Sequence, residues 1–128
     1  MVNQGRGLCI LIVDDEPLIR RALARRLKKQ RVALAGGPDE VHKLLAQGQR
    51  PDVVLTDYDL GAGRTGLEVV EEVWRVCPEA LIYIITGEPD GVPASLTIKV
   101  TGVHCKGSAE VNELLAKLKV GERPTGQK

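Results

Sequence analysis

The chain alternates between short unbroken apolar runs and longer segments whose apolar residues recur every three or four positions. The apolar runs cover residues 8–13, 32–35, 53–56, 80–85 and 103–105. Runs without polar alternation are typical of strands that are buried on both faces. The segments between them show helical spacing, which is clearest in the last one, with Val111, Leu114, Leu115 and Leu118. The pattern therefore predicts five strands that alternate with helices.

Prolines and caps help to set the helix boundaries. Pro17 suits the first turn of the first helix, and Pro78 ends the third helix. The segment from Glu88 to Val100 has the weakest pattern, and Pro93 is expected to start a short helix there. The expected inward-facing positions are Leu18, Ile19, Ala22, Leu23 and Leu27 in the first helix, Val41, Leu44 and Leu45 in the second, and Val70, Val73, Trp74 and Cys77 in the third. The short helix would carry Leu96 and Ile98.

This alternation predicts an α/β fold with a doubly wound parallel sheet, helices on both faces and right-handed crossovers. The 128 residues suit one domain, with a core of about residues 8–119 and a flexible tail over 120–128. In such sheets, function collects at the carboxyl ends of the strands. The candidate functional residues are therefore those that follow each strand.

The composition is that of an ordinary globular chain, with 43% hydrophobic and 27% charged residues. A net charge of +1 gives no general reason to expect nucleic-acid or membrane binding. Three cysteines without a C-x-x-C pairing indicate reduced thiols, and Cys9 and Cys105 are expected to be buried. No segment suits a membrane span or a cleaved signal peptide, so we expect a cytoplasmic protein.

The residues at the strand ends share a chemistry. The first strand ends in Asp14-Asp15, the third in Asp57, the fourth in Thr86 and the fifth in Lys106. Three carboxylates at one edge repel each other unless a hard cation such as Mg²⁺ neutralises them. A hydroxyl and an ammonium are natural partners for phosphoryl oxygens. Taken singly, these residues are ordinary turn or surface residues, but together they predict phosphoryl transfer with one aspartate as nucleophile.

Four segments, "ILIVDDEP", "VVLTDYDL", "IITGE" and "HCKGS", resemble in order and spacing the signature segments of response-regulator receiver domains. The resemblance runs from about Leu8 to Leu118. It implies the flavodoxin-like strand order 2-1-3-4-5 and a phosphoacceptor role for Asp57. It also implies a site for Mg²⁺ (or Mn²⁺) formed by Asp14, Asp15, Asp57 and the backbone carbonyl of Asp59.

The same resemblance implies roles around this centre. Thr86 and Lys106 would bind phosphoryl oxygens, Gly87 would leave room for the phosphodonor, and Asp59 and Glu88 would tune the site. The implied partner is a histidine kinase or a histidine phosphotransfer domain, and phosphorylation would switch an interaction surface that could also support a weak homodimer. Enzymatic activity would be limited to self-phosphorylation from acyl phosphates and autodephosphorylation.

The sequence departs from the family pattern at three places. Gly107 follows the lysine where the family usually has proline, and we expect a trans peptide bond there. Val103 occupies a position that is often aromatic, so an aromatic switch residue is lacking. The segment between Thr86 and Lys106 is slightly short, which predicts a short or mobile fourth helix.

Other functions compete with this interpretation. Gly61-Ala62-Gly63-Arg64-Thr65-Gly66 matches a dinucleotide fingerprint, but Thr65 and Glu68 form a capping box where a pyrophosphate would bind. Asp57 and Asp59 have the spacing of a dehalogenase-type phosphatase, although Gly61 stands where that family has threonine. The basic first helix lacks the interleaved aromatics of a nucleic-acid site. The strongest alternative is a receiver fold that signals without phosphorylation.

Overall fold

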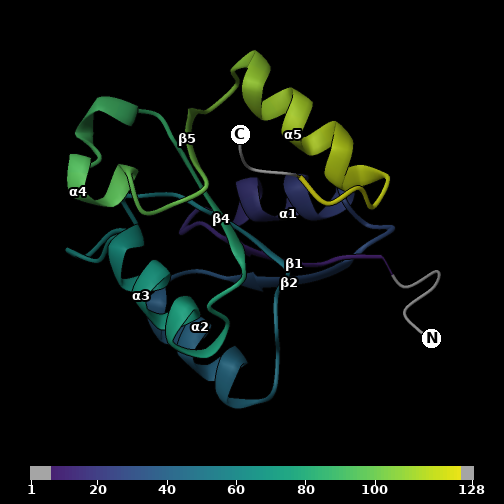
Figure 1. The fold of residues 1–128 in the computed structure, drawn as a ribbon, viewed down its shortest axis with the longest axis horizontal. Coiled ribbons are helices and arrows are strands. Elements are labelled where there is room, and N and C mark those ends of the chain that lie inside the picture. Colours follow the sequence, from purple (N-terminus) through teal and green to yellow (C-terminus); the bar gives the residue numbers. More distant parts are fainter. Residues whose placement is uncertain (1–6, 125–128) are drawn as a thin grey trace.

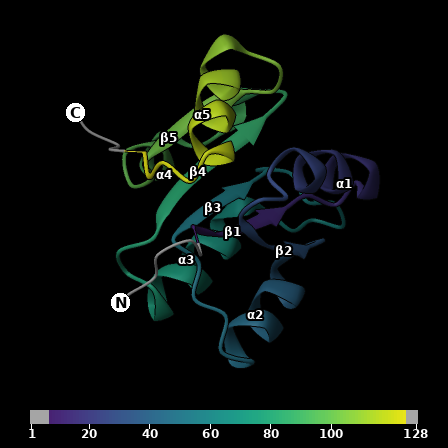
Figure 2. The same cartoon turned by 90° about the vertical axis from the view of Figure 1, so that its right-hand side faces the viewer.

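The computed structural model describes residues 7–124 and forms a five-stranded sheet in which all strands are parallel. The strand order is β2-β1-β3-β4-β5, which confirms the expected doubly wound, flavodoxin-like arrangement. Figure 1 shows the fold, and Figure 2 labels all five strands. The elements are β1 (Cys9–Val13), α1 (Pro17–Arg26), β2 (Arg31–Ala35), α2 (Pro38–Ala46), β3 (Val53–Thr56), α3 (Gly66–Val76), β4 (Leu81–Thr86), the 3-10 turn η1 (Pro89–Gly91), α4 (Ala94–Thr97), β5 (Gly102–Cys105) and α5 (Ala109–Lys119).

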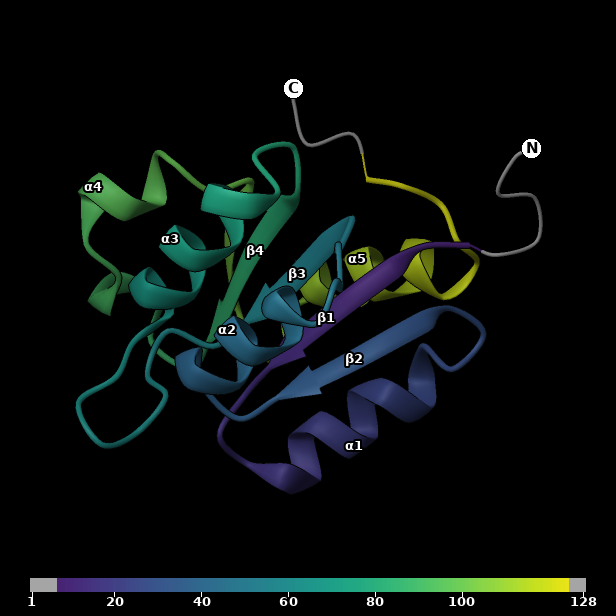
Figure 3. The same cartoon turned by 90° about the horizontal axis from the view of Figure 1, so that it is seen from below.

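The central strands are apolar throughout because they contribute to two cores. Successive side chains of a strand point to opposite faces, so Leu11 and Val13 face one core while Ile10 and Ile12 face the other. One core is covered by α2, α3 and α4, and the other by α1 and α5. Figures 1 and 3 show these two groups of helices on opposite sides of the sheet.

The helices begin where the sequence indicated. Pro17 and Pro38 occupy first-turn positions of α1 and α2. The hydroxyl of Ser108 accepts a hydrogen bond from the Val111 amide at 3.3 Å and so caps α5. At the start of α3, Glu68 accepts from the Thr65 amide at 3.2 Å, which is the carboxylate half of the expected capping box. None of the helices formed by residues 7–124 is long and apolar enough to cross a membrane.

Several side chains differ from their expected burial. Leu18 and Ala22 belong to the apolar stripe of α1 but are both exposed, Leu18 at 76%, because they lie on the part of α1 that does not contact the sheet. Cys105 is also exposed, whereas we expected it to be buried. The physical reason is that β5 is an edge strand and Cys105 is its last residue. Cys9, on a central strand, is buried as expected.

The segment around the fourth helix is short, as expected. The 3-10 turn covers Pro89–Gly91, and α4 has only four residues after Pro93. Leu96 anchors this segment in the core with 2% exposure.

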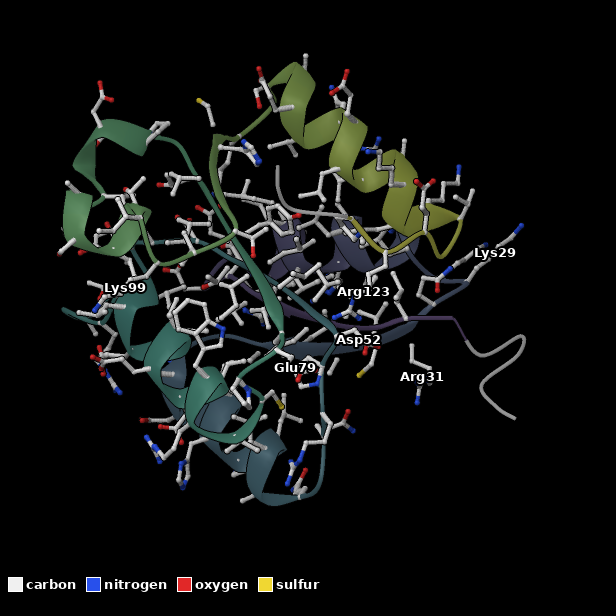
Figure 4. The ribbon with its side chains drawn as sticks, in the orientation of Figure 1. Lys29, Arg31, Asp52, Glu79, Lys99 and Arg123 are labelled. Carbon is white, nitrogen blue, oxygen red and sulfur yellow. The ribbon has the colours of Figure 1, made fainter. Side chains whose placement is uncertain are left out.

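The register of the sheet brings the functional strand ends together. Val13 is paired with Thr56, Thr56 with Ile84, and Thr86 with Cys105. The residues that follow β1, β3 and β5 therefore emerge at the same edge as the end of β4. At the opposite edge, Arg123 lies 3.4 Å from Asp52 and Pro124 is buried, so residues 120–124 contact the domain (Figure 4). Residues 125–128 of the expected tail lie outside the described range.

Gly66 is predicted to be essential for the close contact between α3 and the end of β3. Its amide donates to the Tyr58 carbonyl at 2.6 Å, and an added Cβ would lie 2.8 Å from the Asp57 carbonyl oxygen. Because displacing the backbone around Asp57 costs free energy, Gly66→Ala should lower the free energy of unfolding by about 1–3 kcal/mol. Urea titration followed by circular dichroism measures this change.

The matched control is Gly91→Ala, since a Cβ there meets nothing closer than 3.9 Å. Its effect should stay within about 0.5 kcal/mol. Equal stabilities for the two variants would show that the close contact at Gly66 is unimportant.

Candidate functional site

Three carboxylates gather at the carboxyl edge of the sheet. Asp14 and Asp15 follow β1 and Asp57 follows β3, and each offers an oxygen within 4.8 Å of the other two. Asp14 and Asp57 are buried, whereas Asp15 is exposed. The structure thus brings together the acidic residues that the sequence selected.

Lys106 neutralises part of this negative charge. Its Nζ lies 2.8 Å from Asp57 Oδ2 and 3.4 Å from Asp14 Oδ2. Desolvation disfavours the charged ammonium, but the hydrogen bond to Asp57 and the nearby carboxylate charges outweigh it, so the pKa of Lys106 is raised. Lys106 is therefore held as a cation between the two buried carboxylates.

Asp57 and Asp14 are oriented in the same way. Oδ1 of Asp57 accepts from the Tyr58 amide at 2.7 Å, and Oδ1 of Asp14 accepts from the Glu16 amide at 2.9 Å. In both residues the other oxygen, Oδ2, faces Lys106. Each carboxylate is thus fixed by the backbone on one side and by the ammonium on the other.

The remaining expected site residues surround an open hollow of about 400 Å³ beside Asp57. Thr86 lies at the end of β4, and Lys106 reaches the hollow from the loop after β5. Gly87 is exposed, and a Cβ added there would meet no atom within 4 Å, so this wall is open. The full lining comprises Asp15, Glu16, Asp57, Asp59, Gly61, Thr86, Gly87, Glu88 and Lys106.

The glycine-rich loop after β3 forms one wall of this hollow. Gly61, Ala62 and Gly63 all have positive φ angles, of 78°, 53° and 78°, which turn the chain sharply. A Cβ on Gly61 would lie 3.0 Å from Asp15 Oδ2, so the absence of a side chain lets the loop approach the carboxylates. The side chain of Asp59 accepts from the Gly61 amide at 3.1 Å and stabilises the turn.

Arg64 fastens this loop to two helices. Its Nε donates to Glu68 at 2.9 Å, and its Nη2 donates to Asp39, in the first turn of α2, at 3.1 Å. These contacts lower the pKa of both carboxyl groups, because the hydrogen bonds from the guanidinium stabilise their charged forms. The end of the glycine-rich loop at Arg64 is therefore held by α2 and α3, while the part of the loop at Gly61 faces the aspartates.

Two of the departures from the family pattern have visible structural effects. Gly107 has a φ of 78°, a conformation that proline cannot adopt, and residues 7–124 contain no cis peptide bond. Val103 is half-buried and packs against the core shared with α4. Its neighbour His104 instead stacks on Tyr83, with ring centroids 6.0 Å apart, on the α5 side of the sheet.

The donor set fits a hard divalent cation. The ligand atoms are carboxylate oxygens, which Mg²⁺ and similar cations prefer. Three carboxylates and one ammonium leave a formal charge of −2, which one divalent cation balances. Asp15 is the exposed member and faces the hollow, so a hydrated cation can reach it.

Sequence reasoning missed three contributors. Arg20 donates to the Asp14 carbonyl at 2.6 Å and so supports the first acidic pair from α1. The pairing of Arg64 with Glu68 could have been found from their i, i+4 spacing, but its contact with Asp39 spans 25 residues and has no local signal. The close approach of Gly61 to Asp15 likewise has no local signal, since the glycine pattern indicates only a roomy turn.

Comparison with known proteins adds a family match. Residues 10–118 match the model of the response regulator receiver domain. The chain is 33% identical over 122 residues to the photosynthetic apparatus regulatory protein RegA of Rhodovulum sulfidophilum, which covers 89% of this chain and 63% of RegA. It is 33% identical over 102 residues to the transcriptional regulatory protein AruR of Pseudomonas aeruginosa, covering 75% of this chain and 39% of AruR. The chain thus spans only part of these relatives.

Solved structures share the fold. A response regulator from Burkholderia pseudomallei, with a phosphorylated aspartic acid, a calcium ion and citrate, superposes with a TM-score of 0.70 at 24% identity, over 87% of this chain and 66% of that one. A receiver domain protein from Clostridium thermocellum gives a TM-score of 0.71 at 20% identity, over 89% and 93% of the two chains.

The ammonium of Lys106 is predicted to stabilise the folded chain at neutral pH. Lys106→Met leaves Asp14 and Asp57 facing each other without a counter-charge, so the free energy of unfolding at pH 7 should fall by about 1–3 kcal/mol. In the unmodified chain the pKa of Lys106 is raised above its usual value of 10.5, so its stabilising contribution is complete below pH 10.5. This contribution is lost as the pH rises through the pKa of the folded state, so the difference between Lys106→Met and the unmodified chain should shrink above pH 10.5.

Urea titrations at pH 7 and at about pH 11 measure these differences. Lys99→Met is the control, because Lys99 is exposed and precedes β5, whereas Lys106 follows this strand at the other edge of the sheet. A loss that is the same at both pH values would mean that Lys106 acts through packing alone.

Proposed function

The chain belongs to the response regulator receiver family, and from this premise we propose that it accepts a phosphoryl group on Asp57. The proposal rests above all on the environment of the Asp57 carboxylate. It is buried, one oxygen is fixed by a backbone amide, and the other points at Lys106 beside two further carboxylates. An aspartate that only stabilised a turn would not need a lysine and two further carboxylates beside it.

Each residue of the site has a chemical role in this proposal. Asp57 Oδ2 is the nucleophile that attacks phosphorus, while the leaving group departs toward the open side at Gly87. Asp14, Asp15, Asp57 and the backbone carbonyl of Asp59 would hold Mg²⁺ (or Mn²⁺), which when bound neutralises charge on the phosphoryl oxygens. Lys106 and the Thr86 hydroxyl bind those oxygens after transfer.

Two acidic side chains near the hollow would tune the reaction. Asp59 and Glu88 both line the space next to Asp57. Their negative charges act on any water that approaches an acyl phosphate, so they influence its hydrolysis. The Asp59 side chain is engaged in its own turn, which leaves Glu88 as the freer of the two within residues 7–124.

The natural phosphodonor in this proposal is a phosphohistidine on a histidine kinase or a phosphotransfer domain. The exposed arginines of α1, Arg21 and Arg25, lie four residues apart and form a basic face on the helix that follows Asp14 and Asp15. Such a face suits an acidic partner surface. Output would follow from changes around Thr86, α4 and β5.

A receiver fold that acts without phosphorylation is the second candidate. It is favoured by Val103, since a half-buried valine cannot rotate between inward and outward positions as an aromatic ring can. In that case the carboxylate site would contribute to the stability of the folded domain, and the surface of the domain would bind its target constitutively. Chemical phosphorylation separates the two candidates.

Incubation with acetyl phosphate and Mg²⁺ is expected to add one phosphoryl group, detected by intact-protein mass spectrometry. The adduct should be absent in Asp57→Asn and in the presence of a chelator. Asp59→Asn is the matched control, because metal binding in this proposal uses only its backbone carbonyl; this variant should still be labelled, whatever the change in the lifetime of the adduct. An unlabelled chain under these conditions and with histidine-phosphate donors would favour the phosphorylation-independent module.

Charge reversal on α1 tests the docking face. The double variant Arg21→Glu, Arg25→Glu should slow transfer from a histidine-phosphorylated donor by at least about tenfold at low salt, while labelling by acetyl phosphate stays unchanged. Lys117→Glu, Lys119→Glu on α5 makes the same charge change elsewhere and serves as the control. Equal slowing by both double variants would mean that net charge, not the α1 face, governs transfer.

A further inference from the structure

An apolar cavity of about 300 Å³ lies between α1, α5 and the sheet, on the far side of Asp57 from the acidic hollow. Its floor is formed by Ile12, Leu55 and Ile85 of the three central strands. Its walls are formed by Ile19, Ala22 and Leu23 from α1 and by Val111 and Leu115 from α5. Ala22 and Arg26 are exposed, so this space is open to solvent.

The cavity follows from the composition and from the position of α1. The chain has no phenylalanine, and Ala22 offers only a methyl group toward the space. Helix α1 has no fully buried residue, in contrast to α2, α3 and α5. Figures 2 and 3 show α1 standing apart from α5, toward β2. The side chains of the two helices therefore do not close over the sheet.

The two ends of the cavity differ in charge. At one end lie Asp14 and Asp57, whose charge is partly balanced by Lys106. At the other end the lining includes Arg26, an exposed residue at the end of α1 that has no ion pair within residues 7–124. An anion would be repelled by the aspartates and attracted by Arg26.

We propose that this cavity is a binding site for a small molecule with an apolar body and an anionic head, such as a medium-chain carboxylate. The body lies along the apolar walls and the head contacts the Arg26 guanidinium. A space of this size with mostly apolar walls and a few charged groups is typical of a ligand site. The proposal does not rest on the proposed phosphoacceptor function, although Asp57 lies at one end of the cavity, because binding requires neither a metal ion nor a phosphodonor.

The dimensions favour a chain of moderate length. The cavity volume corresponds to about ten water molecules at their share of the liquid, which is about 30 Å³ each. Ile19 and Arg26 are separated by about 10 Å along the helix axis, at about 1.5 Å for each residue. A straight apolar chain that starts beside Ile19 therefore reaches Arg26 with its head group.

Octanoate and 1-octanol are suitable probes, since they share an apolar chain and differ in the charge of the head. Binding to the full chain without metal is followed by amide chemical shifts in two-dimensional NMR. Both probes should bind with 1:1 saturation and shift resonances of α1, α5 and β3. Arg26→Gln should weaken octanoate binding by at least about threefold and leave 1-octanol unchanged.

Arg25→Gln is the matched control for this charge effect, because Arg25 is an adjacent exposed arginine outside the cavity lining. It should bind both probes as the unmodified chain does. An equal loss of octanoate affinity in Arg25→Gln and Arg26→Gln would overturn the assignment of the head group to Arg26.

A larger side chain at Ala22 tests whether the probes bind in this cavity. Ala22→Phe should reduce binding of both probes by at least about tenfold, because an apolar ring then occupies part of the space between α1 and α5. Ala22→Leu is the milder variant if the ring does not fit, and Ala116→Leu, on the exposed side of α5, is the control. The proposal fails if neither probe saturates, if the shifts map elsewhere, or if folded Ala22 variants bind undiminished.

Discussion

The arrangement of the site depends on bringing negative charge to one edge of a sheet and holding it there. Asp14 and Asp57 are buried next to each other, which is unfavourable unless their charges are compensated. Lys106 supplies that compensation from the loop after β5, which is three strand positions from β1 in the sheet. The parallel register makes this meeting possible, because it brings the ends of β1, β3 and β4 to the same level. The apolar strands that build the two cores thus also determine where the charges lie.

Much of this could be predicted from the sequence. The unbroken apolar runs identified all five strands, and the strand-end rule selected Asp14, Asp57, Thr86 and Lys106 from residue order alone. The structure brings these residues together, while their proposed roles in phosphorylation and metal binding remain predictions. Apolar periodicity was a weaker guide to burial: Leu18 and Ala22 follow the pattern of the first helix and are nevertheless exposed. Burial depends on how each helix sits on the sheet, and residue spacing carries little information about that position.

Contacts between distant segments were beyond sequence reasoning for the same reason. Arg64 and Asp39 meet because α2 and α3 pack on the same face of the sheet, and the exposure of Cys105 follows from the edge position of β5. The glycine-rich loop illustrates the opposite case. Its pattern suggested a pyrophosphate cradle, yet Glu68 already accepts from the Thr65 amide at the start of α3. The glycines instead allow a sharply turned loop to pass close to Asp15.

The orientation of the Asp57 carboxylate has a consequence for regiochemistry. Its two oxygens are not equivalent, because the Tyr58 amide occupies Oδ1 while Oδ2 faces the Lys106 ammonium. A new bond to phosphorus on this carboxylate would therefore form at Oδ2, with the incoming group entering along the side that the lysine now contacts. The ammonium would then exchange a carboxylate oxygen for a phosphoryl oxygen without leaving its place. A single cation would thus serve as counter-ion to both the free carboxylate and the acyl phosphate.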